Sequence, residues 1–153
     1  MNQETEKQCE NRLLVIGPTE QLVEFRERVH DADLALSFNA IRPEPEGLRG
    51  VQAESPLDID PDAVRSGLRP ARSSPEWRLA RWGCEGQGPT ELSEDNPEGQ
   101  RLTYEILTSR RSPDALLEFA SERFPGLVLD NSWSVTGGAA GRDRFQGGQH
   151  EKV

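Results

Sequence analysis

The apolar residues in the first part of the chain recur with two periods, which predict two strands and a helix between them. Residues 13–16 form a short apolar run closed by Gly17-Pro18, typical of a buried strand and a turn. A helix over 19–29 follows, because apolar residues recur there at spacings of three and four and Thr19 can cap its start. Apolar residues then alternate over 34–38, which predicts a half-buried strand.

The same order of patterns recurs toward the end of the chain. Residues 102–106 alternate between apolar and polar, which predicts a strand with one face inward. Ser112-Pro113-Asp114 favours a helix start, and the apolar stripe that follows ends at Pro125-Gly126. Residues 127–135 then predict a strand or a bent pair of strands. Gly137-Gly138 predicts a turn into a short strand around 142–145.

A strand, a helix and a strand therefore appear twice, which indicates the fold class. Each predicted helix has one apolar stripe and each strand has one apolar face. Two such units bury the stripes against the faces when both helices lie on one side of an antiparallel sheet. The prediction is an α+β, ferredoxin-like domain over residues 12–149, with two helices packed on one face. We expect residues 1–11 to be a disordered lead-in and 150–153 to be a tail.

Between the two units lies a long charged insertion, predicted at about 46–100. Residues 44–62 hold six acids and one base, 63–84 five arginines and one acid, and 85–100 five acids and no base. The net charge of −9 over 153 residues comes mainly from these two acidic stretches. Such an arrangement is suited to steering a charged partner, although a solvated loop explains the same charges.

Residues of this insertion are the candidates for binding a partner. Two tryptophans flanked by arginines can form a contact surface for a protein, or stack on bases. The alternative is that the tryptophans cover the sheet while the arginines pair with the acidic flanks. The candidate residues are Arg65, Arg69, Arg72, Trp77, Arg78, Arg81, Trp82, Glu91, Glu94 and Asp95.

Side chains able to support catalysis or bind a metal ion show no motif. His30 and His150 have no carboxylate or cysteine at ligand spacing, so we predict neither a metal site nor a cofactor. Nearby arginines could activate the Cys84 thiol, but a buried small hydrophobic residue is the favoured interpretation. Residues 137–141 resemble half of a phosphate loop, yet no helix pattern follows, which favours a hairpin loop. We predict no catalytic residue and no enzyme.

Hydropathy and cysteine use point to a cytoplasmic protein. No stretch approaches the roughly 20 apolar residues of a membrane span, and the first twelve residues lack the apolar centre of a signal peptide. Only two cysteines are present, 75 positions apart, so a disulfide framework is not expected. The sequence predicts no membrane association and leaves the oligomeric state open.

Several elements of the chain resemble the YubB-type ferredoxin-like domain family. The specific elements are residues 38–45, which read Phe-Asn-Ala-Ile-Arg-Pro-Glu-Pro, and Trp82-Gly83. The strand and helix over 12–29, the helix stop at 124–126 and the 137–141 turn extend the likeness to residues 11–149. The family is carried by bacteriophages, prophages and plasmids. The resemblance implies an antiparallel sheet with helices on one face, and no catalytic residues are carried over.

Two hypotheses for function follow. The first is a non-enzymatic accessory protein of a mobile element that binds a host or phage protein, in one variant as an inhibitor of host defence. The second is a single-stranded nucleic-acid-binding domain that uses residues 65–81, with Trp77 and Trp82 as stacking platforms. The net charge of −9 opposes the second hypothesis, because affinity for phosphates rests on a basic surface.

Overall fold

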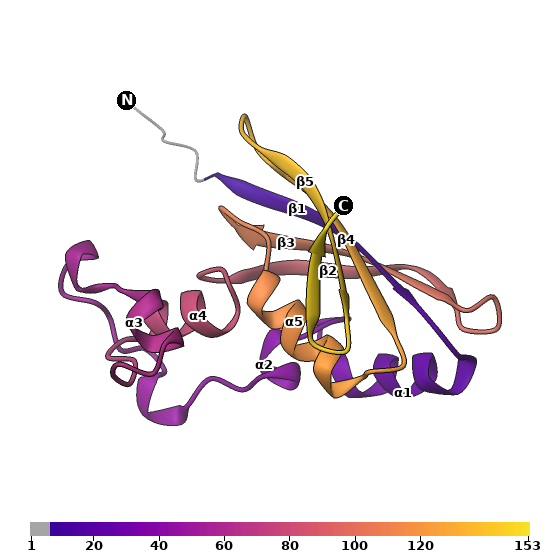
Figure 1. The fold of residues 1–153 in the computed structure, drawn as a ribbon, viewed down its shortest axis with the longest axis horizontal. Coiled ribbons are helices and arrows are strands. Elements are labelled where there is room, and N and C mark those ends of the chain that lie inside the picture. The colour runs from indigo at the N-terminus through magenta and orange to yellow at the C-terminus, as the bar shows by residue number, and fades with distance from the viewer. Residues whose placement is uncertain (1–6) are drawn as a thin grey trace.

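A single antiparallel sheet with helices on one face forms the core of the molecule (Figure 1). A computed structural model describes residues 7–153. The strands are β1 (Gln8–Ile16), β2 (Gln87–Asn96), β3 (Arg101–Ser109), β4 (Val128–Val135), β5 (Ala140–Gln146) and β6 (Gln149–Lys152). The helices are α1 (Thr19–Val29), α2 (Phe38–Ile41), α3 (Pro61–Arg65), α4 (Ser74–Arg81) and α5 (Asp114–Arg123), and short 3-10 turns cover Glu46–Leu48 and Pro56–Asp58. The α+β class is therefore confirmed.

The strands are ordered β2-β3-β1-β4-β5-β6, so β1 lies inside the sheet although it comes first in the chain. Every neighbouring pair is antiparallel. In β1, Leu13 lies between Tyr104 of β3 and Asn131 of β4. Alternate residues of β1 are buried on the helix side, as the period of two requires.

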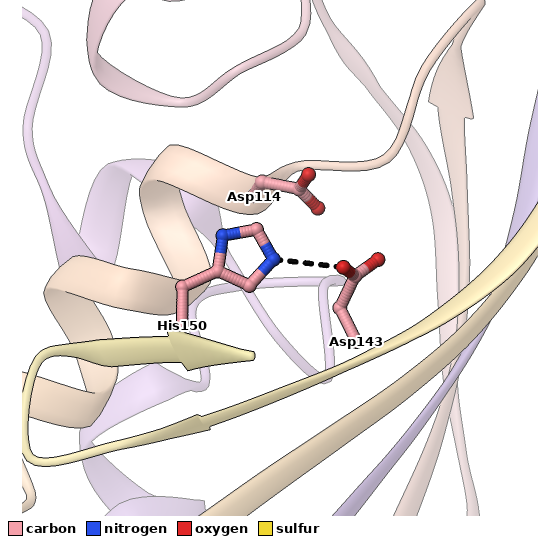
Figure 2. A group of neighbouring side chains, drawn as sticks. All are labelled: Asp114, Asp143 and His150. Atoms are coloured by element: carbon pink, nitrogen blue, oxygen red, sulfur yellow. Dashed lines mark hydrogen bonds and ion pairs between the residues drawn. The ribbon is translucent and has the colours of Figure 1, made fainter. Parts of the chain in front are cut away.

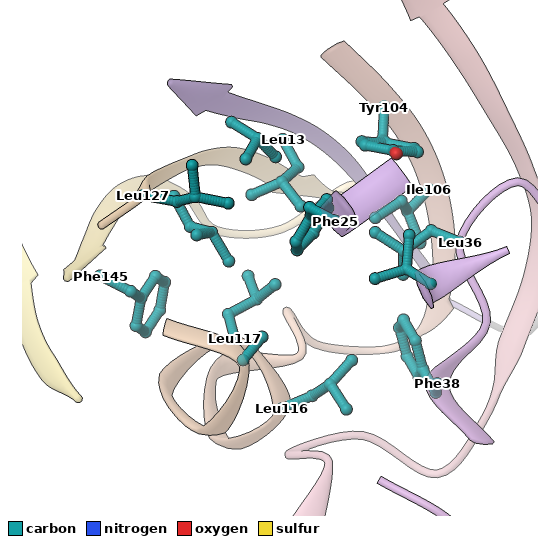
Figure 3. Close-up of a cluster of buried hydrophobic side chains, with 14 of the residues drawn as sticks. Leu13, Phe25, Leu36, Phe38, Tyr104, Ile106, Leu116, Leu117, Leu127 and Phe145 are labelled. Atoms are coloured by element: carbon teal, nitrogen blue, oxygen red, sulfur yellow. The ribbon is translucent and has the colours of Figure 1, made fainter. Parts of the chain in front are cut away.

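The hydrophobic core fills the space between the sheet and the helices (Figure 3). Leu22, Phe25 and Val29 of α1 are buried at the predicted spacing, and Leu116 and Leu117 of α5 are buried as well. The ring of Phe25 also packs edge-on against two aromatic rings, those of Tyr104 and Phe124. Both predicted helices are therefore confirmed, but not the cap at Thr19, whose hydroxyl donates to the Pro97 carbonyl instead.

The predicted strand over 34–38 is wrong. Leu34 forms only an isolated bridge with Asp31, and Phe38 begins α2. Instead of pairing with the backbone of a strand, this stretch forms hydrogen bonds with side chains of β2. The Leu36 N–H donates to the Thr90 hydroxyl, and the Phe38 N–H donates to the Gln87 side chain. The alternation of apolar residues therefore reflects an extended connection in which Leu36 and Phe38 are buried in the core.

The second strand of the first unit comes instead from within the predicted insertion. β2 pairs with β3 and forms one edge of the sheet, so residues 87–96 belong to the sheet itself. The segment that the sheet does not use runs from the end of α1 to the start of β2, and α3 and α4 extend from one end of the molecule (Figure 1).

Both predicted chain ends need correction. Of the lead-in expected over 1–11, residues 1–6 lie outside the described part, whereas 8–11 belong to β1. The expected tail over 150–153 contains most of β6, which pairs with β5. Among residues 7–153, no helix combines the length and the apolar character needed to cross a lipid bilayer.

Candidate functional site

Three side chains from distant parts of the sequence meet where the β5–β6 hairpin approaches the start of α5 (Figure 2). Asp114 is the first residue of α5, Asp143 lies on β5, and His150 lies on β6. In the β5–β6 register, Phe145 is opposite His150, so His150 and Asp143 project from the same side of the hairpin. We call Asp114, Asp143 and His150 the Asp–His cluster.

The geometry of the Asp–His cluster is tight and partly enclosed. His150 Nε2 lies 2.8 Å from Asp143 Oδ1. One nitrogen or oxygen atom from each of the three side chains lies within 4.8 Å of the other two. The side chain of Asp143 is 4% exposed and that of His150 is 25% exposed, so solvent reaches the cluster from the histidine side.

Hydrogen bonds and stacking hold each of the three side chains in place. Trp133 Nε1 donates to Asp143 Oδ2 at 2.7 Å, and Ser112 Oγ donates to Asp114 Oδ1 at 2.7 Å. The Phe145 ring stacks on the imidazole of His150, with ring centroids 4.4 Å apart. Such contacts fix the orientation of ligating or proton-transferring groups before anything binds.

Gly141 allows the tryptophan to reach Asp143. A Cβ atom at this position would lie 2.7 Å from Cζ2 of the Trp133 indole, much closer than atoms can approach without displacement. Trp133 and Gly141 are directly paired between β4 and β5. The 137–141 turn is thus a hairpin connection, as favoured from the sequence, and its last glycine makes room for a side chain that orients the cluster.

The electrostatic environment of the Asp–His cluster disfavours an isolated negative charge. Burial raises the pKa of Asp114 above its ordinary value, the hydrogen bond from Ser112 opposes that rise, and the nearby Asp143 adds to it. Two carboxylates so close together are stabilised by a proton, a protonated histidine or a bound cation.

An open pocket of about 680 Å³ borders the cluster. Asp114, His150 and Trp133 line it on one side. Arg110 and Arg111, both exposed, also line it. The pocket therefore combines donors for a cation with a positively charged border, and a ligand can reach the histidine from solvent.

The tryptophans predicted as surface candidates are buried, which corrects the proposal that they stack on bases or contact a partner. Trp82 is 2% exposed and Trp77 is 8% exposed. Their rings pack edge-on, with centroids 5.5 Å apart, and Trp82 also packs against Phe38. The alternative given for them, packing in the core, is what the structure contains.

Two of the predicted arginines are part of the internal structure of the insertion. Arg69 donates two hydrogen bonds to Glu76, whose side chain is fully buried, and this bond lowers the pKa of Glu76 to about 2. Arg78 pairs with the buried carboxylate of Glu44 and lies over the Trp82 ring. These ion pairs stabilise the segment and leave their charges unavailable to a ligand.

The remaining predicted residues are scattered over the surface. Arg65 pairs with the exposed Asp62 and lines the pocket, Arg72 is exposed, and Arg81 contacts the Val64 carbonyl. The three acids lie on β2: Glu91 is exposed, Glu94 accepts a hydrogen bond from Thr103, and Asp95 pairs with Arg26. The structure therefore does not gather the predicted residues into one site.

The cysteine considered as a nucleophile is inactive in this environment. Cys84 is fully buried, and burial raises the pKa of its thiol to about 12. A thiolate is the reactive form of cysteine, so the thiol is protonated at neutral pH. The interpretation of Cys84 as a small hydrophobic residue agrees with this burial.

The Asp–His cluster was missed because its members are 7 to 36 positions apart and follow no motif. The absence of a carboxylate at ligand spacing in the sequence did not exclude one in space, because Asp114 and Asp143 lie beside His150. One signal was present in the sequence: Gly147-Gly148 after the 142–145 strand favours a tight hairpin, and a hairpin there brings His150 beside Asp143.

Comparisons with known proteins support the fold alone. No protein-family model matches the chain, and no curated protein matches it significantly. A crystal structure of the protein api92 from Yersinia pseudotuberculosis, assigned to the family model DUF1281, is similar in fold, with a TM-score of 0.54. The two share 10% sequence identity over 97% of this chain and 98% of that one. Over 97% of its length the chain is therefore similar in fold to a solved structure.

Proposed function

We propose that this chain is a non-enzymatic binding protein whose partner is another protein, contacted through the outer part of the segment between α1 and β2. The observation that carries the proposal is the exposure of two leucines in that segment. Leu57 is 94% exposed and Leu68 is 80% exposed. Val51, in the same segment, is also exposed. The side chains of leucines this exposed bury almost no apolar surface when the chain folds. Binding of a partner would remove that surface from water and so be favoured by the hydrophobic effect.

The segment that carries these leucines is ordered, which favours its use as a binding surface. Arg69 and Glu76 join the loop after α3 to α4 by a bidentate ion pair, and Glu76 also accepts the backbone N–H groups of Asp60 and Arg72. Val64 of α3 is buried. A surface held in this way loses little conformational entropy on binding.

Charges around the leucines define the chemistry of the partner. Leu57 is followed by Asp58, Asp60 and Asp62, while Arg65 precedes Leu68 by three residues. An apolar centre with a charged rim is typical of protein interfaces, so the partner should offer apolar clefts bordered by charges of both signs. The structure thus favours Leu57 and Leu68 over the tryptophans first predicted as contacts.

The test is capture and reconstitution of the complex. The tagged protein is incubated with a lysate of the cells that carry its gene, the stoichiometric partner is purified, and its affinity is measured by calorimetry. Leu57→Ser with Leu68→Ser should weaken binding by about tenfold or more per leucine, because each buried leucine contributes about 1.5–3 kcal/mol. Val153→Ser is the matched control, since Val153 is exposed outside the segment.

Two results would contradict this proposal. One is the absence of any stoichiometric partner. The other is equal affinity in the double variant and in the wild type. Weak binding to the Val153→Ser variant, together with wild-type affinity for the double variant, would instead place the interface at the C-terminal edge of the sheet.

The remaining expectations stay proposals. The order β2-β3-β1-β4 with α1 and α5 on one face supports a ferredoxin-like core extended by β5 and β6. Membership in the YubB-type family, a mobile-element setting, a cytoplasmic location and inhibition of host defence are further proposals. Nucleic-acid binding loses its support, because Trp77 and Trp82 are buried and Arg69 and Arg78 are paired.

A further inference from the structure

We propose that the Asp–His cluster binds a divalent first-row transition-metal ion, for which Zn²⁺ is the probe. Asp114, Asp143 and His150 would each supply one ligand atom. None of its three members belongs to the segment that carries Leu57 and Leu68, so the proposal does not rest on the protein-binding proposal. A metal site here adds a second binding property to the chain.

The types of the donors favour this class of ion. One imidazole nitrogen with two carboxylates suits Zn²⁺ and its neighbours in the first transition row, whereas Ca²⁺ and Mg²⁺ prefer oxygen ligands alone. The two carboxylates also offset the charge of a divalent ion. An uncharged His150 then serves as a ligand, as the metal requires.

The distances fit a common ion. Ligand atoms about 2.0–2.2 Å from one ion lie roughly 3–4 Å from each other. His150 Nε2 and Asp143 Oδ1, at 2.8 Å, lie slightly closer together than that range, and a donor atom of Asp114 lies within 4.8 Å of both. We expect ion binding to draw the Asp114 carboxylate, which accepts a hydrogen bond from Ser112, toward the other two ligands.

The surrounding contacts match those that orient metal ligands. The Trp133 indole and the Ser112 hydroxyl each occupy one oxygen of a carboxylate, which leaves the other oxygen for an ion. Phe145 holds the plane of the His150 ring. Outer contacts of this kind sustain metal affinity, and their loss costs about 10–100-fold.

The pocket of about 680 Å³ beside Asp114 and His150 gives the ion an open coordination position. Zn²⁺ is held by three protein ligands, with water in the fourth position, in the open class of zinc sites in proteins. Water fills that position in the absence of any other ligand.

The experiment is a titration of the full chain, first treated with EDTA, with Zn²⁺ alone. Calorimetry should show one ion bound per chain. The nitrogen resonances of the His150 ring should shift at the same stoichiometry. His30 is an internal control, because it is exposed, caps the C-terminal end of α1 and is outside the cluster. Equal shifts of both histidines would mean adventitious binding only and would overturn the proposal.

Variants locate the site. Asp143→Asn and His150→Gln should each weaken Zn²⁺ binding at least tenfold, whereas His30→Gln with Asp31→Asn should leave it unchanged. Trp133→Phe removes the hydrogen bond to Asp143 together with part of the ring that packs on Gly141, and it should weaken binding about tenfold while the fold is retained. Circular dichroism checks that each variant is folded. Wild-type affinity in Asp143→Asn, or in a folded Trp133→Phe, would overturn the proposal.

Discussion

The segment between α1 and β2 and the Asp–His cluster use charge in opposite ways. In the segment, Glu76 and Glu44 are buried opposite arginines, so each charge is neutralised inside the molecule. In the cluster, two carboxylates face one histidine beside an open pocket. The segment holds its charged residues close together along the sequence, whereas the three members of the cluster are 7 to 36 positions apart.

The difference shows that the density of charge along a sequence does not locate a site. Neighbouring charges of opposite sign tend to pair with each other when the segment folds. An excess of one sign arises when the neighbours in sequence pair elsewhere, as Arg142 and Arg144 on either side of Asp143 do when they pair with Asp130. Four predictions test whether the first region is structural.

The largest expected effect is that of Glu76→Ala. This substitution removes the acceptor of the Asp60 and Arg72 backbone N–H groups and leaves the Arg69 guanidinium without its carboxylate. The free energy of unfolding should fall by about 3 kcal/mol, measured by urea denaturation. Glu54→Ala, at an exposed position, is the control and should change it by less than about 0.5 kcal/mol. Equal effects would contradict a structural role for Glu76.

Gly83→Ala should come next, because Gly83 follows α4 closely and packs against the backbone at the start of α5. Its φ of +89° is unfavourable for other residues, and a Cβ would lie 3.0 Å from the backbone nitrogens of Asp114 and Ala115. We expect a loss of about 2 kcal/mol in unfolding free energy. The control is Gly67→Ala, with a similar φ of +79° but open space, which should cost about half as much. A larger loss at Gly67 would mean that the contact at Gly83 is unimportant.

The pH dependence of stability provides the third test. The folded-state pKa of Glu76 is about 2, below its ordinary value of 4.5, so folding favours the ionised carboxylate. Its contribution is therefore fully present above pH 4.5 and is lost as the pH falls toward 2. Wild type should lose up to about 1.4 kcal/mol per pH unit more than Glu76→Gln in that window. If the unfolding free energies of wild type and Glu76→Gln changed in parallel from pH 4.5 to 2, Glu76 would not be the group that causes the loss of stability.

The smallest effect is expected for Arg65→Ala. Arg65 was among the residues singled out from the sequence, but its ion pair with Asp62 joins two exposed side chains three positions apart. Such pairs contribute about 0.5 kcal/mol or less. Thermal unfolding should therefore change little. A loss as large as that of Glu76→Ala would show that exposed charges also hold the segment together.

Much of the fold followed from periodicity. Each of β1, β3 and α1 carries a regular apolar pattern, because each buries one face in the core. β2 could not be recognised in this way, since its ten residues include Leu92 as their one large apolar side chain and Pro89 interrupts them. An edge strand with little burial leaves almost no hydrophobic signal.

The candidate site was harder to predict than the fold. Side-chain clusters depend on strand register, and a shift of one residue in the β5–β6 pairing would turn His150 away from Asp143. The Trp82-Gly83 pair was recognised for another reason, its resemblance to a family. The structure provides a physical reason for this pair. The side chain of Trp82 packs in the core, and the Trp82 carbonyl accepts a hydrogen bond from the Leu116 N–H in the first turn of α5.

The two edges of the sheet differ in a way that bears on self-association. A free edge is a template on which the strand of another molecule can add, and chains can then join into aggregates. β2 presents Glu91, Glu94 and Asp95, so two such edges repel each other at neutral pH. β6 is only four residues long and offers few backbone groups for pairing. Acid conditions neutralise the carboxylates of β2 and therefore favour pairing between the β2 edges of two molecules.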